Sequence, residues 1–225
     1  MIKFEEVSKI YPDDSVAIRD INMAIDHQEF VSIAGHSGAG KTTLLKMILA
    51  EEFPSRGRVL VDEAEVQDLR KHEVNELRRR VGIVFQDFRL LAHKTVFENV
   101  SFAMEVAGRD DEEIEADVPY ALNLVGLGRK AHNFPRQLSG GEQQRAAIAR
   151  AIVNQPDIVI ADEPTGNLDP MNTYDIVEIL NRIHELGTTV ILATHNTGII
   201  DNLDKRVVTI EEGRLVHDTG NRSKK

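Results

Sequence analysis

The sequence predicts an α/β fold in which a parallel-sheet core carries an N-terminal antiparallel β lobe and an inserted α-helical subdomain. Three observations lead to this prediction. Short apolar runs rich in β-branched residues alternate with segments of helical character along much of the chain. Residues 1–30 contain strand-like runs and turns without a helix, whereas residues 88–155 have a helical pattern throughout. Strands that alternate with helices are typical of βαβ units, which build a parallel sheet.

Five apolar runs are expected to form the strands of the core. They are Phe30–Ala34, Val81–Phe85, Ile158–Ala161, Val190–Ala193 and Val207–Ile210. Nearly continuous apolar runs of this length are typical of strands whose two faces are both covered. Several of these strands are therefore expected to be buried on both faces.

Helix signals lie between these runs. A helix is expected over residues 41–50, and a second over residues 95–108, where Thr95-Val-Phe-Glu98 forms a capping box. A third is expected over residues 169–187, because Asp169 is a good N-cap and the proline after it suits the first helical position. Pro119 lies inside a further helical segment, which should therefore be kinked or divided into two helices.

The composition excludes several classes of protein. The chain has 225 residues, with 27 Lys and Arg against 37 Asp and Glu, so its formal charge is −10. This acidic balance argues against a general nucleic-acid-binding protein, which would present a basic surface. The sequence contains no cysteine, which excludes a disulfide scaffold and a cysteine-ligated metal site. Its longest apolar runs are far below the roughly 20 residues of a membrane span, and its first residues do not resemble a secretory signal.

Residues 35–42 match the phosphate-binding motif G-x-x-x-x-G-K-[ST]. The motif follows a predicted strand and opens a predicted helix, so backbone N–H groups and the helix dipole should both favour a phosphate. Lys41 can reach the β- and γ-phosphates of a nucleotide, and Thr42 can ligate Mg²⁺. The alternative is a glycine-rich turn without a ligand, but motif and context are both satisfied. The residues expected to bind the nucleotide are Gly35, His36, Ser37, Gly38, Ala39, Gly40, Lys41, Thr42 and Thr43.

An apolar run ends in two carboxylates at Asp162 and Glu163. Asp162 is expected to hold Mg²⁺ directly or through water, as the acid at the end of a Walker B strand does. Glu163 would lie at the carboxyl end of the sheet, where it could polarise an attacking water molecule. The alternatives are a turn or capping role for Asp162 and a surface position for Glu163.

The segment Leu138–Gln144 combines a capping box with two glycines at a helix start. Ser139 and Glu142 have the capping-box spacing, which predicts a helix regardless of function. The glycines expose backbone N–H groups and so favour a second anion site. One chain would then carry two phosphate-binding helix N-termini but one triphosphate motif. Two chains facing head-to-tail would pair each motif with the other chain's glycines.

The order of these motifs resembles that of an ATP-binding-cassette (ABC) ATPase, and the resemblance covers nearly the whole chain. The matching segments are Gly35–Thr42, Gln86, Leu138–Glu142, Ile158–Glu163, Asn167–Asp169 and His195. The resemblance implies a Mg²⁺-dependent hydrolysis of ATP to ADP and phosphate. It also implies one domain over residues 1–225. Residues 1–87 and 156–225 would form the catalytic core with its β lobe, and residues 88–155 the helical signature subdomain.

The resemblance implies a role for each matching residue. Tyr11 would stack on adenine, although a tyrosine before a proline turn could instead be a packing residue. Gln86 would contact Mg²⁺ and the attacking water, and His195 would sense the γ-phosphate rather than cap or pack. Asp169 would lie at the seam of a dimer. The residues that would close over the partner's γ-phosphate are Ser139, Gly140, Gly141 and Glu142.

The chain departs from the family pattern in small ways. His36 stands where proline is frequent, Thr42 where serine is frequent, and Asn196 follows the switch histidine where an acid is common. None of these removes a catalytic group, but Asn196 could alter how His195 is held.

Within the family, four segments resemble those of the cell-division ATPases. They are Val84–Leu91, Lys94–Val100, Leu138–Arg145 and Ala161–Pro170. Residues 164–169 are also similar to the ATPases of lipoprotein-release and macrolide-exporter systems, which are the alternative. The resemblance to the cell-division ATPases implies that the chain forms a homodimer and does not bind nucleic acid. It also implies that the homodimer lies at the cytoplasmic face of the plasma membrane, bound to a membrane protein resembling FtsX. Such a complex would regulate cell-wall hydrolases in cell division.

The loop after Gln86 is expected to receive the membrane partner. Three large apolar side chains, Phe88, Leu90 and Leu91, follow a residue that would contact Mg²⁺. At least one of them would line a groove for a short helix of the partner, as the resemblance implies. The alternative is that they anchor the helical region to the sheet.

Overall fold

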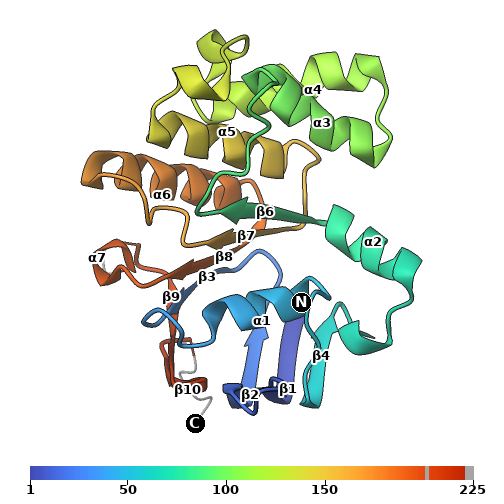
Figure 1. Ribbon diagram of the computed structural model, residues 1–225, viewed down its shortest axis with the longest axis vertical. Coiled ribbons are helices and arrows are strands. Elements are labelled where there is room, and N and C mark those ends of the chain that lie inside the picture. Colours follow the sequence, from blue (N-terminus) through green and yellow to red (C-terminus); the bar gives the residue numbers. More distant parts are fainter. Residues whose placement is uncertain (201–202, 221–225) are drawn as a thin grey trace. The chain divides into compact units, whose positions relative to one another are not determined.

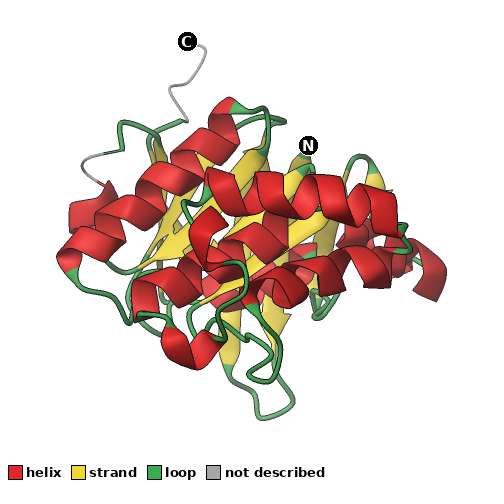
Figure 2. Ribbon diagram, turned by 90° about the horizontal axis from the view of Figure 1, so that it is seen from above, coloured by secondary structure: helices red, strands yellow, loops and turns green. Residues whose placement is uncertain are grey.

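The computed structural model describes residues 1–200 and 203–220, and the chain divides into two compact units. The first comprises Met1–Arg78 and Thr189–Lys225, and the second comprises Arg79–Thr188. Each unit contains both helices and strands, which confirms the predicted α/β class (Figure 1). Figure 2 distinguishes the helices from the strands by colour. Residues 88–155, expected to form a helical subdomain, lie wholly within the second unit.

The first unit contains the expected antiparallel lobe at the N-terminus. Its strands pair in the order β2-β1-β4-β5. The buried residues of β1 and β2 alternate except where the pairing is irregular, and facing pairs such as Phe4 and Met23 fill one side of the sheet. The last two strands were not predicted from the sequence. The strands are β1 (Ile2–Ile10), β2 (Val16–Ile25), β4 (Arg56–Val61) and β5 (Ala64–Glu65).

A second sheet in the same unit carries the nucleotide motif. Its strands pair in the order β10-β9-β3-β8, and β3 is parallel to both of its neighbours. Every residue of β3 and β8 is buried, as the continuous apolar pattern predicts. The strands are β3 (Phe30–Ala34), β8 (Thr189–Thr194), β9 (Arg206–Glu211) and β10 (Arg214–Asp218); the helices are α1 (Lys41–Ile48), α2 (Lys71–Arg79), which ends at the unit boundary, and α7 (Thr197–Ile200).

The second unit consists of a parallel strand pair, four α-helices and two short 3₁₀ helices. Strands β6 (Val81–Phe85) and β7 (Ile158–Asp162) pair in register from Val81 opposite Ile158 to Phe85 opposite Asp162. Figure 1 shows the α-helices of this unit by label. They are α3 (Val96–Ala107), α4 (Asp111–Leu124), α5 (Gly140–Ile152) and α6 (Pro170–Glu185).

Local signals explain where these helices begin. Helices α3, α4 and α5 each start with a capping box, and Asp169 caps α6 by accepting hydrogen bonds from two backbone N–H groups. Such caps satisfy donors that have no partner within the helix. Helix α4 continues through Pro119, so the predicted alternative of two helices is wrong.

Helix α5 packs closely against strand β6. A β-carbon at Gly82 would lie 2.2 Å from the carbonyl oxygen of Ala151, so only glycine allows the helix this close. At the other end of the strand, the buried Gln144 side chain donates a hydrogen bond of 3.2 Å from Nε2 to the carbonyl of Phe85. The start of α5 is thereby held at the end of β6.

Candidate active site

The phosphate-binding motif forms a loop between β3 and α1 in the first unit. Gly40 is the N-cap of α1 with a φ of 106°, a left-handed conformation that favours glycine. A β-carbon at this position would lie 2.5 Å from the carbonyl oxygen of Ala17. No side chain caps α1, and its first turn contains no acid. Its first N–H groups therefore suit an anion.

Lys41 is buried in this loop, with only 5% of its surface exposed. Its Nζ donates hydrogen bonds of 2.7 Å to the carbonyl of Gly35 and 3.1 Å to the carbonyl of His36. The loop is thus wrapped around the ammonium group. His36, which departs from the family pattern, places its Nδ1 2.7 Å from the carbonyl oxygen of Ser37.

Tyr11 lies beside the same helix. Its hydroxyl is 3.3 Å from Oγ1 of Thr43, and the ammonium of Lys9 lies 5.1 Å from the centre of its ring. Sequence reasoning placed both Tyr11 and Thr43 in the nucleotide site, and the structure brings them together.

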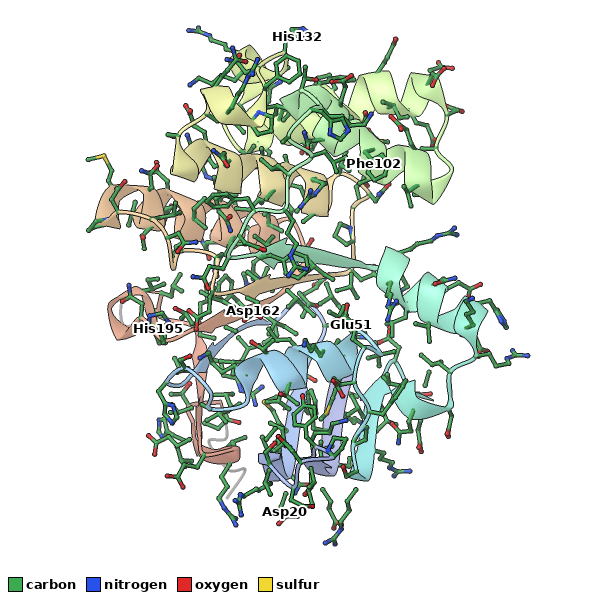
Figure 3. All side chains as sticks on the ribbon, viewed as in Figure 1. Asp20, Glu51, Phe102, His132, Asp162 and His195 are labelled. Carbon is green, nitrogen blue, oxygen red and sulfur yellow. The ribbon has the colours of Figure 1, made fainter. Side chains whose placement is uncertain are left out.

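His195 comes directly after strand β8 and is exposed (Figure 3). The following residue, Asn196, accepts a hydrogen bond of 3.1 Å at its Oδ1 from the N–H of Gly198. Its own N–H donates to Oγ1 of Thr194 over 3.1 Å. Asn196 therefore caps the short helix α7, a role that an acid at this position could also fill.

In the second unit, the ends of two paired strands bring three expected residues together. Asp162, which Figure 3 labels, is the last residue of β7 and pairs with Phe85. Gln86 and Glu163 therefore follow at the same edge. Glu163 has a φ of 49°, which is uncommon for a residue with a side chain.

Gln86 is held by Asn167. Nε2 of Gln86 donates to Oδ1 of Asn167 over 3.3 Å, and Nδ2 of Asn167 donates to the carbonyl of Gln86 over 3.4 Å. The Gln86 amide also packs on Gly166, where a β-carbon would lie 2.7 Å from its Nε2. Sequence reasoning matched Asn167 to the family but gave it no role; its side chain links the loop after β6 to the loop after β7.

Asp169 and the start of α5 are linked through Asn172. Oδ1 of Asp169 accepts from the N–H groups of Met171 and Asn172, and its Oδ2 accepts from Nδ2 of Asn172 over 2.5 Å. These bonds, those of Asn172 above all, lower the pKa of Asp169. A β-carbon at Gly141 would lie 2.0 Å from Oδ1 of Asn172. Sequence reasoning missed Asn172, and no local pattern marks it.

The loop expected to receive a partner is strained and anchored. Phe88 and Arg89 have φ values of 58° and 50°, and their carbonyls accept hydrogen bonds of 2.9 and 2.5 Å from the guanidinium of Arg150. Burial and the nearby Arg89 lower the pKa of Arg150. Leu91 is fixed by Asn99, whose Oδ1 accepts from its N–H over 2.7 Å. Phe88, Leu90 and Leu91 are all half-buried.

In the part of the chain that the structure describes, no helix combines the length and apolar character needed to cross a membrane.

Comparison with known proteins identifies the family. Residues 18–166 match the family model described as ABC transporter. A cell division ATP-binding protein FtsE of Bacillus subtilis is 50% identical over 218 residues, which is 97% of this chain and 96% of that protein. The Escherichia coli protein of the same name is 43% identical over 215 residues, with 96% and 97% covered.

A solved structure supports the same assignment. A dimeric ATP-binding cassette in a post-hydrolysis state, bound to ADP and Pi, superposes with a TM-score of 0.85 at 34% identity and covers 97% of both chains. With the motifs described above, these similarities show both the fold and the reaction. The chain belongs to the ABC transporter family and is an ATPase of that family, similar to the FtsE cell-division proteins.

Proposed function

We propose that this chain is the ATPase subunit of a cell-division complex. Two copies would bind ATP head-to-tail and drive an FtsX-like membrane protein that regulates cell-wall hydrolysis. The observation that supports this proposal is the 43–50% identity, over nearly the whole chain, to proteins named for cell division. The chain would lie at the cytoplasmic face of the plasma membrane, held there by its partner.

The residues present fit Mg²⁺-ATP. The loop over residues 35–40 encloses an ammonium group, and the adjoining helix start carries no acid and no side-chain cap. Thr42, Asp162 and Gln86 supply hydroxyl, carboxylate and amide oxygens, which are the donors that Mg²⁺ prefers. We assign these three residues to the metal. When bound, Mg²⁺ neutralises charge on the phosphates.

Glu163 is the residue we assign to the chemistry. Its carboxylate follows the metal-binding aspartate and would accept a proton from the attacking water. Its place directly after strand β7 supports this role, because it lies beside Asp162 at the carboxyl end of the parallel pair. Gln86 would orient the same water, and His195 would contact the γ-phosphate. Lys41 would hold the β- and γ-phosphates, and Tyr11 would stack on adenine.

The signature of each copy would complete the site of the other. The first turn of α5, residues 139–142, would contact the γ-phosphate held by the partner's loop. Asp169 would lie at the seam, where Asn172 connects it to Gly141. The dimeric cassette bound to ADP and Pi, at 34% identity, supports an assembly of this kind.

The membrane partner would dock on the loop after Gln86. Phe88, Leu90 and Leu91 are half-buried, so each could both pack inward and offer apolar surface. The hydrogen bonds from Arg150 hold this loop in a strained shape that a free loop would not keep. A short apolar helix inserted here would link ATP binding to the membrane protein.

Co-purification from membranes with the FtsX-like protein tests this proposal. Phe88→Asp and Leu91→Asp should abolish recovery of the membrane protein, because an unpaired carboxylate would be buried at the interface. Both variants should keep the wild-type melting temperature and ATP affinity. Phe102→Asp is the matched control, since Phe102 is 41% exposed on α3 and lies outside this loop (Figure 3).

The outcomes separate the alternatives. If both variants melt far below wild type, the two residues are core residues and the docking assignment fails. If both remain stable and still recover the partner, the groove lies elsewhere. If the wild-type chain recovers a lipoprotein-release or macrolide-exporter permease in place of the FtsX-like protein, the cell-division role is wrong.

A further inference from the structure

In two capping boxes of the second unit, the glutamate also forms an ion pair with a basic side chain. At the start of α4, Nη1 of Arg109 lies 2.7 Å from Oε1 of Glu113, four residues further on. At the start of α5, Nζ of Lys130 lies 2.5 Å from Oε1 of Glu142, twelve residues away. The first pair is exposed on both sides, whereas Glu142 retains only 17% of its side-chain exposure. The second pair is therefore the less solvated of the two.

Both oxygens of Glu142 are engaged. Oε1 accepts from Lys130, and Oε2 accepts from the N–H of Ser139 over 2.9 Å. The Lys130 ammonium and the Ser139 N–H hold the pKa of Glu142 below its usual value. The first turn of α5 consequently carries a full negative charge at neutral pH. Without a counter-ion, that charge would repel a phosphate at the same helix end.

Lys130 approaches from a fixed segment. It ends a short 3₁₀ helix, Gly128–Lys130, and the residues after it are tied to the first turn of α3. The N–H of Phe97 donates to the carbonyl of Ala131 over 2.8 Å, and the N–H of Val96 donates to the carbonyl of Asn133 over 2.8 Å. The ammonium is thus presented to Glu142 from an anchored turn.

We propose that Lys130 is a positioning residue for the signature, the counter-ion that cancels the charge of Glu142 and so lets α5 of one copy accept the γ-phosphate held by the other. This inference rests on the proposed head-to-tail dimer. Lys130 acts through Glu142 and does not itself touch the nucleotide. Its removal should weaken ATP-driven dimer formation without weakening nucleotide binding to the single chain.

The test measures ATP-driven dimerisation by light scattering in a Glu163→Gln parent, which should not consume the ligand. Lys130→Ala should raise the ATP concentration at half-maximal dimer about tenfold, equivalent to about 1.4 kcal/mol. Lys130→Arg should restore the midpoint, because it restores the charge. The effect should shrink at high ionic strength, where exposed charges are screened.

A double-mutant cycle distinguishes charge compensation from a structural tether. In a Glu142→Gln background, Lys130→Ala should have no further effect, because a glutamine keeps the capping box without the charge. If Lys130→Ala is as damaging in that background, Lys130 is a tether and the inference is wrong. Arg109→Ala is the matched control; it breaks the equivalent pair on α4 and should leave the ATP midpoint unchanged.

The remaining outcomes are also decisive. If the parent dimerises normally and Lys130→Ala leaves the ATP concentration at half-maximal dimer unchanged, the role of Lys130 is wrong but the proposed dimer stands. Failure of the parent to dimerise at any ATP concentration overturns the proposed head-to-tail dimer instead. Fluorescent-nucleotide binding to the single chain should be the same for Lys130→Ala and the parent, and a loss there contradicts the inference.

Discussion

Glycine lies at the start of both α1 and α5, as the N-cap of α1 and as the first residues of α5, yet their first turns are built differently. Helix α1 follows Gly40 with no side-chain cap and no acid in its first turn. Helix α5 follows Ser139, whose hydroxyl accepts from the N–H of Glu142, while Glu142 reaches back to the N–H of Ser139. The first helix start has no side-chain cap, whereas the second is capped by its own residues.

This difference suggests that the start of α1 serves ligand binding, whereas the start of α5 is stable without a ligand. A self-capped helix start is stable before any partner arrives, so it can be presented to a second molecule as a rigid surface. A helix start without a side-chain cap, next to a buried lysine, is suited to receive hydrogen bonds and charge compensation from a bound anion. Nucleotide binding should therefore stabilise the first unit the most and the start of α5 the least.

The largest expected effect concerns the step at which the two helix starts would meet on one nucleotide. Glu163→Gln should slow ATP hydrolysis by at least about 100-fold, since the amide cannot accept a proton from water. ATP should then hold the two chains together as a dimer visible by light scattering. Full activity of this variant would assign the base to another residue.

The next effect tests whether the start of α1 contributes to ATP binding rather than to the stability of the fold. Lys41→Ala should weaken ATP binding by about 1.5–3 kcal/mol, because it removes a charge-assisted contact to phosphate. The melting temperature without nucleotide should stay close to that of wild type, while the increase caused by ATP should disappear. Calorimetry of binding and a thermal melt with and without ATP provide the comparison. Undiminished affinity would contradict the assignment.

The reverse pattern is expected for the self-capped start. Ser139→Ala removes the side-chain oxygen that caps α5 and should lower stability by about 1 kcal/mol. The melting temperature should fall without nucleotide, while ATP affinity of the single chain remains that of wild type. If the melting temperature is unchanged and the single chain loses ATP, the two helix starts do not divide these tasks.

The smallest effect sharpens the view of how α5 is supported. Gly141→Ala would bring a β-carbon against the Asn172 side chain and disturb its hydrogen bond to Asp169. Coupling to Asn172→Ala should be about 0.5–1 kcal/mol, so the double variant should be more stable than the sum of the single effects. Denaturant unfolding of all four proteins measures this coupling. Strict additivity would show that the contact carries no energy.

Much of this arrangement could be predicted because it depends on local rules. The phosphate-binding motif, the capping boxes at Thr95 and Ser139, and the Asp169-Pro170 helix start each lie within a few residues. Such signals act through neighbouring backbone groups, so they keep their meaning in any fold. The continuous apolar runs likewise gave β3 and β8 as fully buried strands.

The contacts that could not be predicted join residues far apart in the sequence. Asn172 lies 31 positions after Gly141, and Arg150 lies 62 after Phe88. These are polar contacts made once, without any periodicity to reveal them. Strand β4 was missed for a related reason, since its first three residues are exposed and two of them are arginines. Its place in the sheet depends on pairing with β1 rather than on its own pattern.

The close approach of α5 to β6 affects how fast a displacement at Gln86 would reach the first turn of α5. Gly82 allows the backbone of α5 to contact strand β6 near Ala151. Near the start of α5, Gln144 donates a hydrogen bond to the carbonyl of Phe85, which precedes Gln86. A helix and strand joined at two points should turn together as one piece rather than bend or melt between those points. A displacement at Gln86 would then reach the signature as a rigid rotation, on the microsecond-to-millisecond scale of collective motions and without a refolding step.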